Sequence, residues 1–232
     1  KRLPILETSG IQLFFNGPES FTPDNRYLLG EAPYLKNFFL ACGFNSIGIQ
    51  SAGGAGKALS EWMVAGEPPF DLWDVDIRRI HPFQNNKTYL FERAKETLGL
   101  LYADHFPFRQ YASARGIRRS AIHQNLLERG ACFGEVAGWE RANWFLPAEL
   151  VGEGNTPEYK YSWGRQNWFD FAAQEHLAVR QKAGFFDMSS FAKFRLEGKD
   201  AQAVLQRIMA NDVDVEPGRI IYGQWLNNSG GI

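Results

Sequence analysis

The chain has 232 residues, of which 44% are hydrophobic and 15% aromatic, enough apolar material for two or three packed units. Its formal net charge is −1, from 25 basic and 26 acidic residues, which argues against a nucleic-acid-binding surface. No apolar run reaches the roughly 18 residues of a membrane span. The two isolated cysteines, Cys42 and Cys132, predict buried structural thiols in a reduced compartment.

The N-terminal part of the chain predicts a strand followed by a loop. Residues 11–16 alternate weakly between apolar and polar, and Asn16-Gly17-Pro18 predicts the turn that ends the strand. Residues 20–26 predict a loop, because Thr22-Pro23-Asp24-Asn25 has the composition of a turn. On these residues alone, Asp24 is expected to cap that turn.

Residues 38–67 are the most distinctive stretch. The apolar run 38–42 predicts a short buried strand, a glycine-dense turn follows, and residues 57–64 predict a helix that Gly66 ends. Such a turn serves either a flat or anionic ligand or simply tight strand–helix packing. A dinucleotide fingerprint is absent, and a phosphate loop ending at Gly56-Lys57 fails at Ser51 and Ala58.

The rest of the chain predicts mainly helices and irregular connectors. A core stripe of Leu90, Ala94, Leu98 and Leu101 is expected on a helix over residues 89–102. Further along we expect a helix over 120–129 capped by Ser120, an irregular connector over 149–164, a helix over 171–184, a strand over 193–197 and a helix over 200–209 capped by Asp200. The four histidines lack metal-ligand spacing, and no nucleophile elbow occurs.

Three separated motifs carry a family resemblance: NGPESFTPD (16–24), LLGEAP (28–33) and CGFNSIGIQSAGGAG (42–56). In this order they resemble the end of the flavin domain in the sarcosine dehydrogenase and dimethylglycine dehydrogenase family. DIRR (76–79) and GWERANWF (138–145) resemble the segments that follow in the same family. For GWERANWF we favour an aromatic-packed linker with a solvated Glu140–Arg141 pair over an interdomain wall. Residues from 185 onward resemble the start of its aminomethyltransferase domain, and the resemblance implies a strand and turn over 217–232.

The resemblance implies a mixed α+β and α/β fold in three parts. These are the C-terminal part of an FAD-dependent oxidoreductase domain (1–80), its central linking domain (81–168) and the start of a T-protein-like folate-binding domain (169–232). The family's ADP-binding fingerprint and its flavin-linking histidine have no counterpart in this sequence. We therefore expect a fragment that is inactive alone.

The resemblance also implies cofactor-binding residues. The positions that would line the flavin are Pro23, Asp24, Gly43, Phe44, Asn45, Ser46, Ile47, Gly48 and Ile49. Phe191 and Tyr222 would face the pterin of tetrahydrofolate, although Tyr222 equally suits a partly buried strand aromatic. No residue is assigned as a catalytic base or as a metal ligand.

The implied activity is FAD-dependent oxidation of an N-methylglycine, sarcosine or dimethylglycine, with transfer of the one-carbon unit to tetrahydrofolate. Electrons would pass to an electron-transfer flavoprotein or to oxygen. The expected location is the cytoplasm in a bacterium or the mitochondrial matrix in a eukaryote. A non-catalytic homologue resembling the regulatory subunit of pyruvate dehydrogenase phosphatase is the alternative, and a paralogue acting on another methylated amine is a third possibility.

Overall fold

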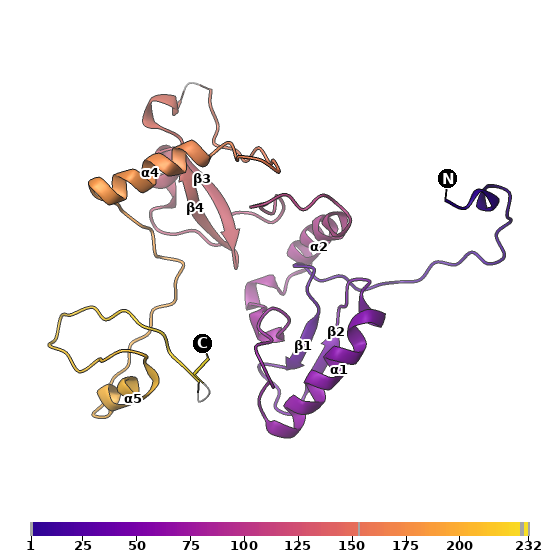
Figure 1. The fold of residues 1–232 in the computed structure, drawn as a ribbon, viewed down its shortest axis with the longest axis horizontal. Coiled ribbons are helices and arrows are strands. Elements are labelled where there is room, and N and C mark those ends of the chain that lie inside the picture. Colours follow the sequence, from indigo (N-terminus) through magenta and orange to yellow (C-terminus); the bar gives the residue numbers. More distant parts are fainter. Residues whose placement is uncertain (1, 153, 228–229, 232) are drawn as a thin grey trace. The chain divides into compact units, whose positions relative to one another are not determined.

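A computed structural model describes residues 2–152, 154–227 and 230–231. The chain divides into two compact units, Lys1–Asp187 and Met188–Ile232, and each is described here by itself (Figure 1). Both units mix helices with strands or bridges, so the predicted mixed α and β character is confirmed. Within the described residues, no helix combines the length and the apolarity needed to cross a membrane.

The first unit contains two antiparallel hairpins and the larger helices. Its elements, in chain order, are η1 (Pro4–Glu7), β1 (Leu28–Glu31), β2 (Phe39–Cys42), α1 (Gly48–Ala65), η2 (Ile77–Arg79), η3 (Pro82–Gln84), α2 (Lys87–Leu101), α3 (His123–Glu128), β3 (Ala131–Val136), β4 (Trp139–Phe145), η4 (Ala148–Leu150) and α4 (Phe169–Gln181). β1 pairs with β2 so that Leu28 faces Cys42, and β3 pairs with β4 with an irregularity between Cys132 and Phe133.

Helix α1 packs along the β1–β2 hairpin and forms the first core (Figure 1). Ala55, Ala58 and Trp62 are the buried residues of α1, and their spacing places them on one helix face. Leu29 of β1, which is 1% exposed, packs against this face. Gly30 has a φ of +108°, and a Cβ atom there would lie 2.5 Å from the Trp62 ring. The close approach of strand and helix therefore depends on this glycine.

The prediction for the glycine-dense segment is wrong, because α1 begins at Gly48 rather than at Lys57. Burial of Ala55 and Ala58 against the hairpin rewards the helical conformation there, and tertiary packing overrides the low helix propensity of glycine. The predicted end at Gly66 is confirmed, since Gly66 has a left-handed φ of 80°. The predicted strand forms as β2, but its last residue Cys42 is exposed, contrary to the expectation of a buried thiol.

Helix α2 confirms the helix predicted near 89–102, but its buried face differs from the predicted one. Tyr89, Arg93 and Thr97 are buried, whereas Leu90 and Leu98 are 39% and 42% exposed. The reason is that α2 packs through polar contacts. The Arg93 guanidinium pairs with Glu135 (2.7 Å) and lies 4.1 Å from the centre of the Tyr111 ring.

The GWERANWF segment is a strand, so the interpretation as a linker is wrong. It forms β4, which pairs along its length with β3 and buries Trp144. Glu140 is buried and pairs with Arg115, accepting a hydrogen bond from Arg115 Nε (2.9 Å) and another from the Gly116 amide (2.6 Å). A solvated pair was expected because the sequence shows Arg141 as the adjacent cation, whereas the partner lies 25 residues away.

Two predicted strands do not form, and one predicted helix is shorter than expected. Residues 11–16 are irregular, with Phe14 and Phe15 at least 80% exposed, and residues 193–197 are irregular as well. Within the described residues neither segment has a pairing partner, and a strand needs one to satisfy its backbone groups. Helix α3 starts at His123, three residues after Ser120, so the predicted side-chain cap is absent.

The irregular connector and helix α4 agree with the sequence prediction. Residues 155–162 lack regular structure, and the rings of Tyr159 and Tyr161 stack with their centres 5.8 Å apart. The amide of Phe145 donates to Glu175 of α4 (2.8 Å), which ties this helix to β4. Burial raises the pKa of Glu175, although the hydrogen bond from Phe145 opposes that shift.

The second unit is built around α5 (Ala201–Ile208), which confirms the helix predicted there. Asp200 is its N-cap residue, but its side chain makes no capping hydrogen bond, contrary to the prediction. Beyond the helix, Met209 and Trp225 form an antiparallel bridge, and the amide of Leu226 donates to the carbonyl of Ile208 (3.0 Å). The strand predicted within 217–232 does not form in the described residues, where only the isolated bridge at Trp225 occurs. Residues 228, 229 and 232 of this prediction lie outside the described residues.

Candidate functional site

The loop 22–25, which carries Pro23 and Asp24, is joined by hydrogen bonds to segment 43–49, and these two residues and that segment were predicted to line a cofactor. The amide of Thr22 donates to Asn45 Oδ1 (2.8 Å), and Asn45 Nδ2 donates to Thr22 Oγ1 (3.1 Å). Asn45 Nδ2 also donates to the carbonyl of Gly43 (2.7 Å). Both side chains are buried, with Thr22 4% and Asn45 1% exposed. The Asn45 amide group is therefore used to hold the two segments together and is not directed outward.

The backbone of the second segment has an unusual conformation. Gly43, Asn45 and Ser46 all have positive φ angles, of 67°, 50° and 66°. Gly43 is required, because a Cβ atom there would lie 2.7 Å from Thr22 Cγ2. Asparagine tolerates the left-handed region better than most residues, which suits the position of Asn45. The turn therefore reverses the chain tightly between β2 and α1.

The surface of this turn combines apolar side chains with the start of α1. Phe44 stacks on Tyr27 with ring centres 4.7 Å apart, and the amide of Ile47 donates to the Phe44 carbonyl (2.9 Å). The Ser46 hydroxyl donates to Glu19 (2.7 Å), while Ile49 is fully exposed in the first turn of α1. The first turn of a helix also leaves backbone N–H groups without intrahelical acceptors.

The glycines that follow leave one face of α1 open. A Cβ atom at Gly53, Gly54 or Gly56 would meet nothing within 4 Å. Packing inside the described chain therefore gives no reason for glycine at these positions, although each glycine costs about 1 kcal/mol of helix stability relative to alanine. This open backbone fits close approach by a flat group lying outside the described residues.

Asp24 is held by an arginine as well as by its own turn. Its carboxylate accepts hydrogen bonds from Arg79 Nε (2.7 Å) and Arg79 Nη2 (3.0 Å), and from the amide of Arg26 (3.2 Å). The expectation that Asp24 caps the turn is therefore correct but incomplete. Arg79, whose side chain is 7% exposed, also donates to the carbonyls of Arg26 (2.6 Å) and Asp76 (3.1 Å).

Helix α2 supplies a contact that sequence inspection missed. The hydroxyl of Thr97 donates to the carbonyl of Thr22 (3.1 Å), and Asn25 Nδ2 donates to the carbonyl of Thr97 (2.7 Å). Thr97 is 0% exposed. A search for apolar periodicity passes over a threonine in a helix, and the 4-residue spacing Tyr89, Arg93, Thr97 was the available signal.

The two residues predicted to contact folate lie in the second unit. Neither is in a helix or strand, and Phe191 and Tyr222 are 45% and 87% exposed. The carbonyl of Tyr222 accepts a hydrogen bond from Asn211 Nδ2 (2.9 Å), which fixes the backbone beside the bridge at Met209. Both residues are thus at least partly exposed to solvent, and their role in folate binding stays a prediction.

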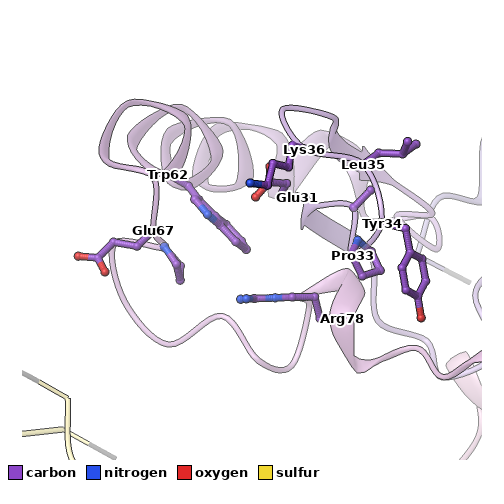
Figure 2. A pocket seen from close by; sticks show the side chains of 11 residues that line it. Glu31, Pro33, Tyr34, Leu35, Lys36, Trp62, Glu67 and Arg78 are labelled. Carbon is purple, nitrogen blue, oxygen red and sulfur yellow. The ribbon is translucent and has the colours of Figure 1, made fainter.

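A cleft of about 510 Å³ that was not predicted lies at the other end of α1 (Figure 2). Arg78 and Trp62 face each other across it, with the guanidinium carbon 5.3 Å from the ring centre. The Arg78 guanidinium is held by Asp76, and this hydrogen bond raises the pKa of Arg78 above its ordinary value. The remaining lining residues come from the β1–β2 loop and the end of α1: Glu31, Ala32, Pro33, Tyr34, Leu35, Lys36, Gly66, Glu67 and Pro68.

Taken together, segments 22–25 and 43–49 offer a rigid support and not an acid–base centre. They present backbone groups and an exposed apolar side chain, and the open glycines that follow in α1 extend this surface. Among the described residues, no group of three or more His, Cys, Asp or Glu side chains is placed to hold a metal ion. Such a surface can bind and orient a group, while the chemistry would come from the bound group itself.

Two protein-family models match consecutive parts of the chain. The FAD dependent oxidoreductase central domain matches residues 65–120, and the GCVT N-terminal domain matches residues 122–232. These two matches place the chain in the class of proteins that join an FAD dependent oxidoreductase central domain to a GCVT N-terminal domain. Helix α2 lies in the first matched range, and α5 lies in the second.

Similar proteins cover nearly the whole chain. It is 48% identical to 4-methylaminobutanoate oxidase (formaldehyde-forming) of Paenarthrobacter nicotinovorans and 39% identical to mitochondrial sarcosine dehydrogenase of Mus musculus, each over 99% of this chain and 27% of that protein. It is 36% identical to the mitochondrial pyruvate dehydrogenase phosphatase regulatory subunit of Mus musculus, over 100% of this chain and 26% of that protein. The chain thus spans about a quarter of the length of these relatives. It belongs to the sarcosine and dimethylglycine dehydrogenase family.

Proposed function

We propose that the protein containing this chain is an FAD-dependent oxidoreductase that removes hydride from an N-methyl group of an amino carboxylate. The observation that carries the proposal is the succession of the oxidoreductase central domain and the GCVT domain in one chain. An N-methyl amine that loses hydride becomes an iminium ion, whose carbon is then available to water or to a folate. The bound flavin supplies the hydride acceptor, which side chains lack.

In this proposal the described chain supplies one wall of the flavin site. The residues assigned to it are Pro23, Asp24, Gly43, Phe44, Asn45, Ser46, Ile47, Gly48 and Ile49. The open backbone of α1 at its glycines and the exposed first turn of that helix support this assignment. The wall orients the flavin and excludes water from one side. Recognition of the substrate carboxylate is left to other parts of the protein.

The GCVT part is proposed to receive the one-carbon unit on tetrahydrofolate. Phe191 and Tyr222 are assigned to the pterin, because exposed aromatic rings stack on flat heterocycles. The domain boundaries 1–80, 81–168 and 169–232 are part of the same proposal. Transfer of electrons to an electron-transfer flavoprotein or to oxygen, and a cytoplasmic or mitochondrial-matrix location, are further parts of it.

The substrate class follows from what the relatives' names share. Sarcosine, dimethylglycine and 4-methylaminobutanoate each join an N-methyl amine to a carboxylate, and the carbon spacer is the same in the two glycine derivatives and longer in 4-methylaminobutanoate. We therefore propose an N-methylamino carboxylate whose chain length remains to be measured. The greater identity to the 4-methylaminobutanoate oxidase supports including the longer substrate in the test.

A second candidate is a regulatory protein without redox activity. Its support is the 36% identity to the pyruvate dehydrogenase phosphatase regulatory subunit over the whole chain. The two candidates share the same fold, which by itself does not fix function. They differ in whether the full-length protein holds a reducible flavin.

The test is anaerobic addition of sarcosine, dimethylglycine or 4-methylaminobutanoate to the full-length protein while the visible flavin absorption is recorded. Glycine and 4-aminobutanoate are matched controls that lack the N-methyl group. The proposal predicts that at least one methylated amine bleaches the flavin and that neither control does. A colourless protein would favour the regulatory candidate, and bleaching by the controls would contradict the substrate class.

A further inference from the structure

Thr97 of α2 is hydrogen-bonded to the loop that carries Pro23 and Asp24. Its side chain is 0% exposed, and its hydroxyl lies 3.1 Å from the carbonyl of Thr22 and 3.1 Å from the carbonyl of Ala94. A helical threonine commonly bonds the carbonyl one turn back, so the Ala94 contact needs no special explanation. The contact with Thr22, which is 75 residues away, does not follow from helix geometry.

The contacts of Thr97 lie on both sides of Pro23 and Asp24, which are assigned to the wall of the flavin site. Thr22 is bound through its carbonyl by the Thr97 hydroxyl, and Asn25 donates through Nδ2 to the Thr97 carbonyl (2.7 Å). Pro23 and Asp24 lie between these two anchors. Asn25 has a positive φ of 58°, a conformation that asparagine tolerates. Helix α2 therefore fixes both ends of the Pro23–Asp24 pair.

The same network of hydrogen bonds continues to segment 43–49, the other part of the proposed flavin wall. The Thr22 amide donates to Asn45 Oδ1, and Asn45 Nδ2 donates to Thr22 Oγ1 and to the Gly43 carbonyl. Thr97, Thr22 and Asn45 are each at most 4% exposed, so water does not replace these bonds easily. A displacement at Thr97 would therefore shift both flavin-facing segments together.

We propose that Thr97 is a positioning residue that sets the spacing of the two flavin-facing segments from helix α2. The proposal rests on the flavin role assigned to those segments under the proposed function. It adds that α2, which lies in the matched central-domain range, determines the geometry of a flavin site formed elsewhere in the chain. Small displacements of such a support are costly, because about 1 Å of misplacement reduces catalysis by as much as a hundredfold.

The test compares three variants of the full-length protein. Thr97→Val keeps the shape of the side chain and removes the hydroxyl, whereas Thr97→Ser keeps the hydroxyl and removes a methyl group. Thr88→Val is the matched control, because Thr88 lies on the same helix and is exposed. The readouts are the flavin absorption spectrum, kcat and KM for the amine, and amide hydrogen exchange of residues 20–25 and 43–47.

The proposal predicts a specific pattern among these variants. Thr97→Val should speed exchange of both segments by about two- to tenfold, as expected for loss of one hydrogen bond. It should also shift the flavin spectrum and lower kcat by about tenfold. Thr97→Ser and Thr88→Val should stay within about twofold of the parent, since neither removes the bond to Thr22.

Three results would overturn the proposal. Faster exchange in Thr97→Val with unchanged spectrum, kcat and KM would show that Thr97 serves stability alone. Equal effects of Thr97→Val and Thr97→Ser would show that the hydroxyl is not the group that matters. A parent protein without flavin would refute the proposed function, and with it the flavin role of Thr97, while the exchange data would still report separately whether the hydroxyl holds the two segments.

Discussion

The Arg93–Glu135 pair is the most deeply buried ion pair in the first unit. Its side chains are 2% and 8% exposed, and Arg93 also donates to the carbonyl of Ser113 (2.8 Å). Glu135 in turn accepts from the amide of Gly138 (2.7 Å). The pair thus connects α2, residues 113–114 and the β3–β4 turn. Removal of the Arg93 guanidinium would leave the Glu135 carboxylate buried without its cation.

We predict that Arg93→Met destabilises the full-length protein by about 3–5 kcal/mol, because one partner of a buried pair is lost. Lys160→Met is the control, since Lys160 pairs with Glu158 at 3.5 Å with both side chains more than 60% exposed. That variant should change stability by less than about 1 kcal/mol. Chemical denaturation measures both values. Equal effects of the two substitutions would contradict the burial argument.

The lowered pKa of Glu140 leads us to predict that the stability of the protein depends on pH. Burial alone would raise its pKa, but hydrogen bonds from Arg115 and from the Gly116 amide outweigh burial, and the pKa is lowered below its ordinary value. A carboxylate with a lowered pKa in the folded state stabilises the fold above its unfolded-state pKa of about 4.5. This contribution is lost as the pH falls through the folded-state pKa.

Glu140→Gln should therefore be less stable than the parent at pH 7, and the difference should shrink as the pH falls below about 4.5. Denaturation curves collected across this range measure the difference. Other titrating groups, such as Glu96 and Glu175, are present in both the parent and the variant. Their contributions to the pH dependence of stability therefore cancel in the difference. A difference that stays constant down to the lowest pH would contradict the assigned role of the charge.

At the scale of elements, two glycines near α1 should respond in opposite ways to alanine. Gly30→Ala combines a left-handed φ with a contact of 2.5 Å to the Trp62 ring, and should cost at least about 2 kcal/mol. Gly54→Ala adds a methyl group to open space inside a helix and should stabilise the flavin-free full-length protein by about 0.5–1 kcal/mol. Thermal unfolding of the flavin-free full-length protein checks both. In the flavin-bound protein Gly54→Ala should weaken flavin binding, because the proposed function places the flavin against this face, and unchanged flavin binding would contradict that placement.

The elements that local sequence determines were predicted correctly. Gly66 ends α1 because its left-handed conformation favours glycine, and α2 and α5 form near the expected residues. The start of α1 could not be predicted, because its glycines lower helix propensity and only packing of Ala55 and Ala58 against β1 compensates. The strands predicted over 11–16 and 193–197 failed because strand formation depends on a partner and not on alternation alone.

The buried face of α2 illustrates a different limit. The spacing of the leucines predicted that the face with Leu90 and Leu98 is buried. The buried face of α2 instead carries Tyr89, Arg93 and Thr97. Each of the two polar residues is buried because a distant group satisfies it: Glu135 for Arg93, and the Thr22 carbonyl for Thr97. Periodicity methods assign polar residues to the solvent face, so they miss a helix that packs through hydrogen bonds.

At the scale of the molecule, the candidate site depends on contacts between residues far apart in sequence. Asp24 and Arg79 are separated by 55 residues, and Thr22 and Thr97 by 75. The family motifs identified which segments belong together, but not the groups that hold them. The central claim is that these segments, held from η2 and α2, form one wall of a flavin site.

An experimental structure of the full-length protein with its flavin bound tests this claim most directly. The account predicts that the isoalloxazine ring is in van der Waals contact with residues 43–49 and with the Pro23–Asp24 loop, and that the Thr22–Asn45 and Thr22–Thr97 hydrogen bonds are intact. A flavin ring that lies elsewhere, with these two segments covered by protein or facing solvent, would contradict it.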